Sequence, residues 1–184
     1  TMQKSYAING QPCSPEAYYS AACDPARHIA IEACAGAGKT WILVSRILRA
    51  LFAGVAPQSI LAITFTKKAA GEMQQRLSEW LAEFAQASDE KLLAELQARG
   101  IASPSAADIA RLRGLQAQLL QNPQTVHIRT FHAWFTALLQ SAPQAVLADL
   151  GLPQPFTTVD SDAALIEHIW PAFYAAVAAD AQLD

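Results

Sequence analysis

The chain has 184 residues, 52% apolar and 16% charged, with a formal net charge of −3 and a mean hydropathy of +0.15. This composition excludes a disordered chain and is sufficient for the core of one domain, or of one domain and part of another. The sequence has no run of about eighteen apolar residues and no basic start followed by an apolar stretch. We therefore expect neither a membrane span nor a secretory signal, and we expect a cytoplasmic location.

Charge is distributed unevenly along the chain. All 13 Lys and Arg residues lie between Lys4 and Arg129 with 10 acidic residues, a balance of +3. Residues 130–184 hold 6 acidic residues and no Lys or Arg, a balance of −6. Bulk charge therefore argues against sequence-independent binding of nucleic acid. Any contact with DNA would be local and would lie in the first two thirds of the chain.

The first part of the chain predicts alternating strands and helices. Ser14, as an N-cap before a proline, begins a helix that ends near Cys23. The apolar run His28–Ala33 is predicted to be a buried strand that enters a glycine-containing loop, and Ile60–Phe65 is predicted to be a second strand. Further helices are predicted from Thr40 to Gly54 and from Lys67 or Lys68 to about Ala87. This alternation is typical of a parallel sheet with right-handed crossovers.

The next segment, residues 88–122, interrupts this alternation. It predicts two amphipathic helices, Ser88–Gly100 and Ser105–Gln121, the second opening with a Ser105 to Asp108 capping box. We interpret the pair as a helical insertion. A third strand is predicted at Thr125–Thr130. The remaining predicted elements are a helix from Phe131 to Leu139, a short helix from Pro143 to Leu150, a strand at Phe156–Val159 and a helix near Asp162–Ala179.

A candidate phosphate-binding loop follows the first predicted strand. It consists of Ala33, Cys34, Ala35, Gly36, Ala37, Gly38, Lys39 and Thr40. Small residues allow consecutive backbone N–H groups to turn toward a triphosphate, and the helix that follows adds the positive end of its dipole. Lys39 can reach the β and γ phosphates, and the Thr40 hydroxyl can ligate Mg²⁺. The alternative is a glycine-rich turn with a surface lysine; the flanking strand and helix favour nucleotide binding.

Three segments of the sequence resemble the superfamily 1 DNA helicases of the UvrD/Rep group. Residues 32–40 look like motif I of that family, in which alanine is usual at the position of Ala33. Residues 60–73 are similar to motif Ia, and residues 126–132, with Thr130, Phe131 and His132, are similar to motif Ib. The opening of the loop is closer to the RecB/AddA-type subunits of helicase-nuclease complexes. Three motifs in order are more specific than a phosphate-binding loop alone.

The resemblance implies particular site residues. ATP and Mg²⁺ would be held by the loop, with Lys39 and Thr40 as the catalytic pair and Thr40 as the metal ligand. Single-stranded DNA would be contacted by Thr64, Phe65, Thr66, Lys67, Lys68, Thr130, Phe131 and His132. Phe65 would stack on a base, and the lysines would meet a phosphate at a helix N-terminus. Without the family, Phe65 could be an ordinary core aromatic and the lysines a solvated turn.

Two positions near the loop bear on recognition of the nucleotide base. Trp41 follows the loop directly, and we hypothesise that its ring stacks on the base or ribose; a role in the core is the alternative. The glutamine of the family's Q motif falls at Ala17, so recognition of adenine from that position is not expected. Gln11 is a nearby substitute.

Together, the motifs predict an α/β fold, a partial RecA-like P-loop NTPase with a three-layer parallel sheet and a helical insertion at about 88–122. Residues 1–140 would form the N-terminal part of the ATP-binding domain and 141–184 the start of a helical subdomain. No convincing acidic pair for hydrolysis is present, so we expect a fragment that is inactive alone and exposes apolar surface.

The function that the resemblance implies is ATP-dependent 3′ to 5′ helicase or translocase activity on single-stranded DNA in repair or recombination. A further expected partner is the nuclease or helicase subunit of a larger complex. A P-loop phosphotransferase acting on a small molecule is one alternative. A nucleotide-binding scaffold without catalysis in a repair complex is another.

Overall fold

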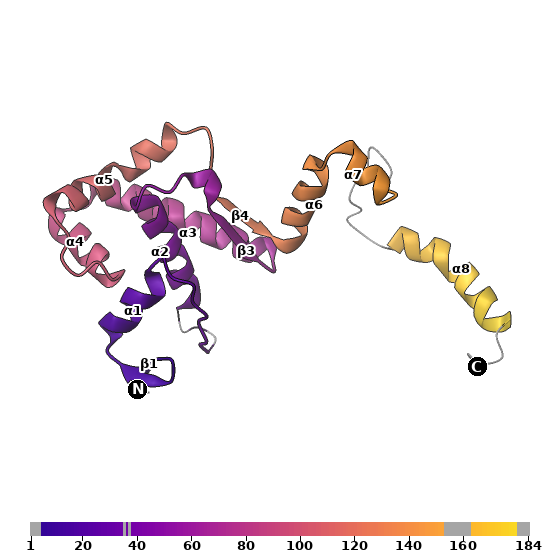
Figure 1. Ribbon diagram of the computed structural model, residues 1–184, viewed down its shortest axis with the longest axis horizontal. Coiled ribbons are helices and arrows are strands. Elements are labelled where there is room, and N and C mark those ends of the chain that lie inside the picture. Colours follow the sequence, from indigo (N-terminus) through magenta and orange to yellow (C-terminus); the bar gives the residue numbers. More distant parts are fainter. Residues whose placement is uncertain (1–4, 35, 37, 153–162, 180–184) are drawn as a thin grey trace. The chain divides into compact units, whose positions relative to one another are not determined.

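The computed structural model describes residues 5–34, 36, 38–152 and 163–179. They fall into two units, Thr1–Trp134 and Phe135–Asp184, with the division inside one helix. The helices are α1 (Pro15–Cys23), α2 (Lys39–Phe52), α3 (Lys67–Gln86), α4 (Asp89–Ala98), α5 (Ala106–Leu120), α6 (Phe131–Ser141), α7 (Gln144–Asp149) and α8 (Ala163–Ala179), with a 3-10 turn, η1 (Pro57–Ser59). The strands are β1 (Tyr6–Ile8), β2 (Gln11–Cys13), β3 (Leu61–Thr64) and β4 (His127–Thr130) (Figure 1).

The core of the first unit lies between α2 and α3. Val44 and Leu48 of α2 are buried together with Leu77 and Phe84 of α3, because each helix repeats its apolar residues along one face. Side chains from α4, α5 and β4 complete this cluster. The packing of α2 and α3 thus determines where the N-terminus of each helix lies.

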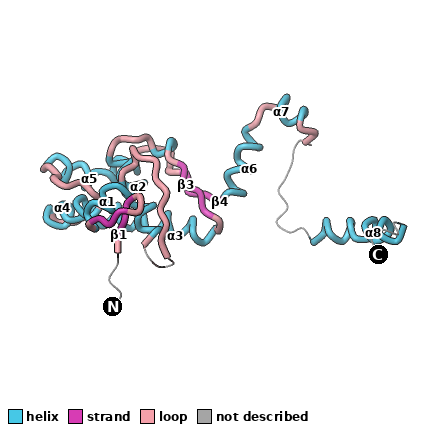
Figure 2. The backbone as a smooth tube through the Cα atoms, turned by 60° about the horizontal axis from the view of Figure 1, so that its bottom comes forward, coloured by secondary structure: helices cyan, strands magenta, loops and turns pink. Residues whose placement is uncertain are grey.

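The predicted insertion is a pair of helices, α4 and α5. Ser88 caps α4, and the predicted capping box is present at the start of α5: the Ser105 hydroxyl accepts a hydrogen bond from the Asp108 backbone, and the Asp108 carboxylate accepts one from the Ser105 backbone. Leu92 and Leu112 face the core. In Figures 1 and 2 this pair lies at one end of the first unit, and the β3–β4 pair lies at the other.

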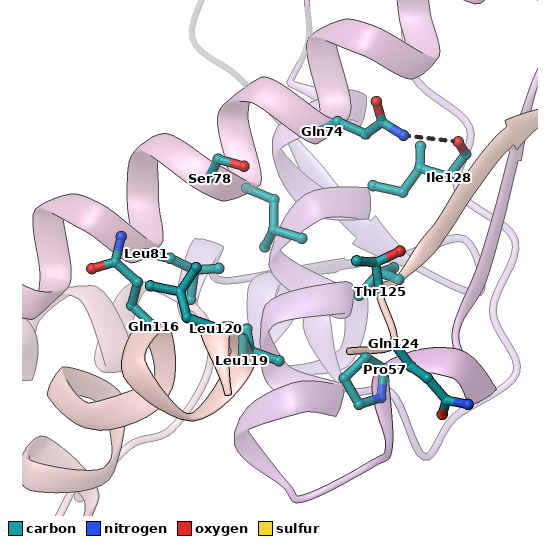
Figure 3. A pocket seen from close by; sticks show the side chains of 12 residues that line it. Pro57, Gln74, Ser78, Leu81, Gln116, Leu119, Leu120, Gln124, Thr125 and Ile128 are labelled. Atoms are coloured by element: carbon teal, nitrogen blue, oxygen red, sulfur yellow. Dashed lines mark hydrogen bonds between the residues drawn. The ribbon is translucent and has the colours of Figure 1, made fainter. Parts of the chain in front are cut away.

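Strands β3 and β4 pair in parallel, with Leu61 opposite His127 and Thr64 opposite Thr130. Helix α3 covers them, and the Gln74 side-chain amide donates to the backbone oxygen of Ile128 at 3.2 Å (Figure 3). This contact ties α3 to β4. The described residues are therefore α/β and mostly helical, with this one parallel pair as the observed part of the predicted larger sheet.

The predicted strand at His28–Ala33 is wrong. The structure assigns no strand there, and residues 28–30 are exposed. A strand requires a neighbour for its backbone N–H and C=O groups, and β3 pairs with β4 instead. Pro25, Leu43 and Ile63 line a cavity of about 480 Å³ beside α2. Apolar residues such as Leu43 and Leu61 stay exposed, in agreement with the apolar surface expected from the sequence.

An N-terminal hairpin, β1–β2, was not predicted. Its turn contains Asn9 and Gly10 with φ values of 51° and 78°, the left-handed conformations that a two-residue hairpin turn requires. The Asn-Gly pair was the signal for it in the sequence. The Tyr6 ring lies 5.0 Å from that of Tyr18 and 5.7 Å from that of Tyr19, which attaches the hairpin to α1.

The second unit contains most of α6, together with α7 and α8. Helices were predicted in all three places. Leu147 of α7 is buried, whereas Trp170, Phe173 and Tyr174 of α8 form an exposed aromatic group. The strand predicted at Phe156–Val159 lies outside the described residues. Among the helices that are described, none combines the length and the apolar character that crossing a bilayer requires.

Two glycines in the insertion are predicted to respond oppositely to alanine. Gly100 has a φ of +84°, and a Cβ there would lie 2.3 Å from the Ser20 Cα, so Gly100→Ala should lower the free energy of unfolding by more than about 1 kcal/mol. Gly114 lies inside α5 with open space around it, so Gly114→Ala should raise that free energy by about 0.5–1 kcal/mol. Urea unfolding of the three proteins measures both effects. A stabilised Gly100→Ala protein would contradict the close approach of the two backbones.

Candidate nucleotide site and nucleic-acid interface

The phosphate-binding loop has the backbone conformation that its glycines permit. Gly36 has a φ of 76° and Gly38 a φ of 90°, both in the left-handed region. A Cβ at either position would meet no atom within 4 Å. Glycine is therefore needed here for its conformation, while the space beside the loop stays open. Ala35 and Ala37 lie outside the described residues.

Helix α2 begins at Lys39, directly after this loop. Gly38 is its N-cap and provides no side chain, and the first turn contains no acidic residue. The backbone N–H groups of that turn are thus free to bind an anion, which the helix dipole also favours. Lys39 Nζ donates to the backbone oxygens of Ala33 and, at 2.8 Å, Cys34, so the ammonium group lies over the loop. Thr40 is exposed in the same turn.

Arg46 holds the segment that leads into the loop. From α2, its guanidinium donates to the backbone oxygens of Ala22, Asp24 and Arg27 at 3.1, 2.6 and 2.8 Å. These bonds satisfy carbonyl groups at and beyond the C-terminal end of α1. The residues before the loop are therefore positioned by α2 rather than by a strand ladder.

A cleft of about 530 Å³ opens beside the loop. Gly36, Gly38 and Trp41 line it from the loop side, and Tyr19 and Gln97 line it from α1 and α4. A hydrogen bond with Tyr6, followed by burial, raises the pKa of Tyr19 to about 12, so its hydroxyl stays protonated at neutral pH. The cleft is large enough for a small ligand and combines aromatic, amide and backbone groups.

Trp41 belongs both to this cleft and to an aromatic cluster. Its ring lies 5.4 Å from that of Tyr19 and 6.1 Å from that of Trp80, both in edge-to-face geometry. The Arg99 guanidinium lies 5.1 Å from the centre of the Trp41 ring. The core role considered for Trp41 is therefore present, and the residue also forms part of the cleft wall.

A second cavity, of about 450 Å³, lies between α3, the end of α5 and the segment before β4 (Figure 3). Leucines such as Leu77 and Leu81 line it, together with uncharged polar side chains such as Gln116 and Gln124. No charged residue is among the described residues that line it. It lacks the cationic groups that a nucleotide phosphate requires, so the cleft beside the loop is the better nucleotide site.

The ends of β3 and β4 bring two of the predicted segments together. Phe65 follows β3 and is 86% exposed, and Phe131 follows β4 and is 40% exposed. Their ring centroids lie 5.7 Å apart. Because Thr64 pairs with Thr130, the residues after each strand project from the same end of the pair. This end presents an exposed aromatic platform.

Cationic residues adjoin this platform. Lys67 and Lys68 are exposed in the first turn of α3, and His132 is exposed in the first turn of α6. Lys68 lies 3.9 Å from Glu72, an exposed pair that contributes little to stability. Two lysines at a helix N-terminus oppose the helix dipole, so an anion bound there would be favoured by both.

Both threonines at the strand ends cap helices. Thr66 Oγ1 accepts a hydrogen bond from the Ala69 backbone N–H at 3.0 Å, and Thr130 Oγ1 accepts one from Ala133 at 3.2 Å. Thr130 is buried, whereas Thr66 is exposed. Both hydroxyl oxygens thus already serve the start of a helix.

The glycine loop at the start of α2, beside a parallel strand pair with its crossover helix, defines a protein of the P-loop nucleotide-binding class. Residues 15–181 match the family model of the UvrD/REP helicase N-terminal domain, and the chain belongs to this family. Membership implies the P-loop NTPase fold. No solved structure matches the chain.

The relatives among curated proteins are all named as the same subunit of an ATP-dependent helicase/nuclease. The chain is 34% identical to that of Streptococcus sanguinis over 105 residues, 57% of this chain and 8% of the relative. It is 45% identical to that of Lactobacillus gasseri over 56 residues, 30% of this chain and 5% of the relative. For that of Levilactobacillus brevis, the values are 36% over 95 residues, 51% and 8%. The chain thus spans less than a tenth of these relatives' lengths.

Three residues of the site were not found from the sequence. Arg46 was placed only by its position off the apolar face of its helix, and Gln97 and Arg99 were seen only as part of an insertion. Each contacts residues far away in the chain, and Arg46, for example, donates to an oxygen 24 positions earlier. No periodicity or local motif reports such a contact.

The cap at Thr130 can be tested apart from any ligand. Thr130→Val removes the oxygen that the Ala133 N–H uses and should destabilise the start of α6 by about 1 kcal/mol, whereas Thr130→Ser keeps it. Hydrogen exchange at the Ala133 amide should be faster in Thr130→Val alone. Equal exchange rates in the two variants would show that the hydroxyl is not a cap.

Proposed function

We propose that this chain is the ATP-binding N-terminal part of an ATP-dependent DNA helicase that moves 3′ to 5′ along single-stranded DNA in repair or recombination. Its membership of the UvrD/REP helicase family and the printed names of its relatives support this proposal. The observation that carries it is the pairing of β3 with β4, which places the residues after each strand at one end of the sheet. Residues 1–140 would belong to the ATP-binding domain and 141–184 to a helical subdomain.

For ATP, the loop residues from Ala33 to Thr40 would bind the phosphates. Gly36 and Gly38 leave room for them, and the free amides of the first turn of α2 would donate to their oxygens. Lys39 would exchange its loop carbonyl partners for the β and γ phosphates. The Thr40 hydroxyl would help to hold Mg²⁺, which supplies charge neutralisation when bound. Trp41 would form one wall beside the base or ribose.

For DNA, Phe65 and Phe131 would provide a stacking platform that does not depend on base identity. Lys67, Lys68 and His132 would contact the phosphates, which position the strand without reading its sequence. Thr64, Thr66 and Thr130 would shape this surface, with Thr66 and Thr130 acting as helix caps beside it.

Further parts of the same assembly would cover the apolar surface beside α2. Leu43, Leu61 and Val55 are exposed there, and the residues before the loop have no strand partner among the described residues. Carboxylates for hydrolysis would come from segments other than those described. The name of the relatives also supports a partner with nuclease or helicase activity, and we place the protein in the cytoplasm.

Lys39 provides the test of nucleotide binding. Lys39→Ala should weaken the binding of ATP with Mg²⁺ by about ten- to hundredfold, the effect of one charge-assisted hydrogen bond, and should leave the binding of adenosine unchanged. Calorimetry on the chain measures both ligands, and Lys91→Ala, at a distant surface, is the matched control. Equal ATP affinity for Lys39→Ala and the unaltered chain would refute the assignment. In a polypeptide that hydrolyses ATP, Lys39→Ala should abolish DNA-stimulated turnover.

The two lysines of α3 provide the test of DNA binding. Replacing Lys67 and Lys68 with Ala should weaken binding to a fluorescent oligothymidylate and should reduce the slope of log K against log salt by about 1.4, since each single-strand phosphate contact contributes about 0.7. The Lys67→Ala single variant should show half this change, and Lys91→Ala, which removes the same charge from α4, should show none. An unchanged slope in the double variant would argue for a nucleotide-binding scaffold or a small-molecule phosphotransferase instead.

A further inference from the structure

The cleft beside the phosphate-binding loop has a wall that comes from the helical insertion. Gln97, near the C-terminal end of α4, lines the cleft together with Gly36, Gly38 and Trp41. Neither Ala17, where the glutamine of the Q motif would fall, nor Gln11 of β2 lines it. The side-chain amide that the structure places beside the loop is therefore that of Gln97.

The end of α4 is held in place by Arg99. This side chain is 1% exposed, and its guanidinium lies 5.1, 4.4 and 5.4 Å from the ring centres of Trp41, Trp80 and Phe84. Arg99 also forms an ion pair with Glu95 one turn earlier. A guanidinium stacked among aromatic rings away from water is held strongly. The same Trp41 ring that contacts Arg99 lines the cleft.

Two further contacts hold the residues just after Gln97. Arg49 of α2 donates to the backbone oxygen of Arg99 at 3.1 Å. Gly100 approaches α1 so closely that a Cβ there would lie 2.3 Å from the Ser20 Cα. The end of α4 is therefore fixed to α1, α2 and α3 at once, and Gln97 lies at a defined place on the cleft wall.

The polar groups opposite the loop are suited to a base that carries an amino group beside a ring nitrogen. A carboxamide offers one acceptor and one donor, which match the N6 amino group and N7 of adenine. Glu16 also lines the cleft, and its carboxylate can accept from an amino group. Guanine presents O6 and N7, both acceptors, so the oxygens of both side chains would face like groups.

We propose that Gln97 of the insertion reads the base of the bound nucleotide and gives the site its preference for adenine over guanine. This inference rests on the proposed binding of ATP by the loop. It adds a contact from a segment that lies about 60 residues beyond the loop in the sequence. Arg99 acts only as a positioning residue, because its contacts are with Trp41, Trp80 and Phe84 and not with the ligand.

The test compares ATP with GTP on the full chain. Dissociation constants for both, with Mg²⁺, would be measured by calorimetry for the unaltered chain, Gln97→Ala and Gln118→Ala. Gln118 is an exposed glutamine on α5 that lies outside the cleft, so it is the matched control. We expect Gln97→Ala to reduce the preference for ATP over GTP by about tenfold, the discrimination of one bidentate contact, mainly by weakening ATP. Gln118→Ala should keep the preference.

The outcomes separate this inference from the proposed function. If the unaltered chain binds neither nucleotide, the proposed ATP site itself fails. If it binds ATP in a Lys39-dependent manner but Gln97→Ala keeps the full preference, or weakens ATP and GTP equally, Gln97 does not read the base. Equal binding of ATP and GTP by the unaltered chain would also overturn the inference.

Discussion

The apolar contact between α2 and α3 is the interaction on which both candidate sites depend. Val44 and Leu48 of one helix are buried with Leu77 and Phe84 of the other. Helix α2 begins at the phosphate-binding loop, and α3 begins at the two lysines beside Phe65. Because a helix is stiff, burying its apolar face also fixes the place and direction of its N-terminus. One core therefore positions an anion-binding helix end at each of two surfaces.

The insertion of α4 and α5 is built onto this core rather than attached loosely beside it. Leu92 and Leu112 extend the apolar cluster, and Arg99 enters the aromatic group formed by Trp41 and Trp80. Two nitrogens of the buried guanidinium have no hydrogen-bond partner, an arrangement that costs free energy unless the stacked rings compensate. The insertion thus links the phosphate-binding helix to the far end of α3, which gives it a direct physical connection to the nucleotide cleft.

The two surfaces differ in how far the chain completes them. The loop, the first turn of α2 and the cleft beside it are assembled from described residues that contact one another. The end of the β3–β4 pair is a platform with exposed rings and cations, and the neighbouring face of α2 keeps Leu43 in contact with solvent. Exposed apolar side chains of this kind mark a surface that other protein segments cover.

The sequence by itself determined the elements whose signals are local: the caps at Ser14 and Ser105, the glycines of the loop and the apolar faces of α2 and α3. It also contained the Asn9-Gly10 signal of the hairpin, which was overlooked. What the sequence could not determine were contacts between distant segments. The apolar run 28–33 looked like a strand, but a strand exists only beside a partner, and only the tertiary structure showed that β3 pairs with β4. The same holds for Arg46, Gln97 and Arg99, whose neighbours lie on other helices, because packing rather than chain order decides which side chains meet.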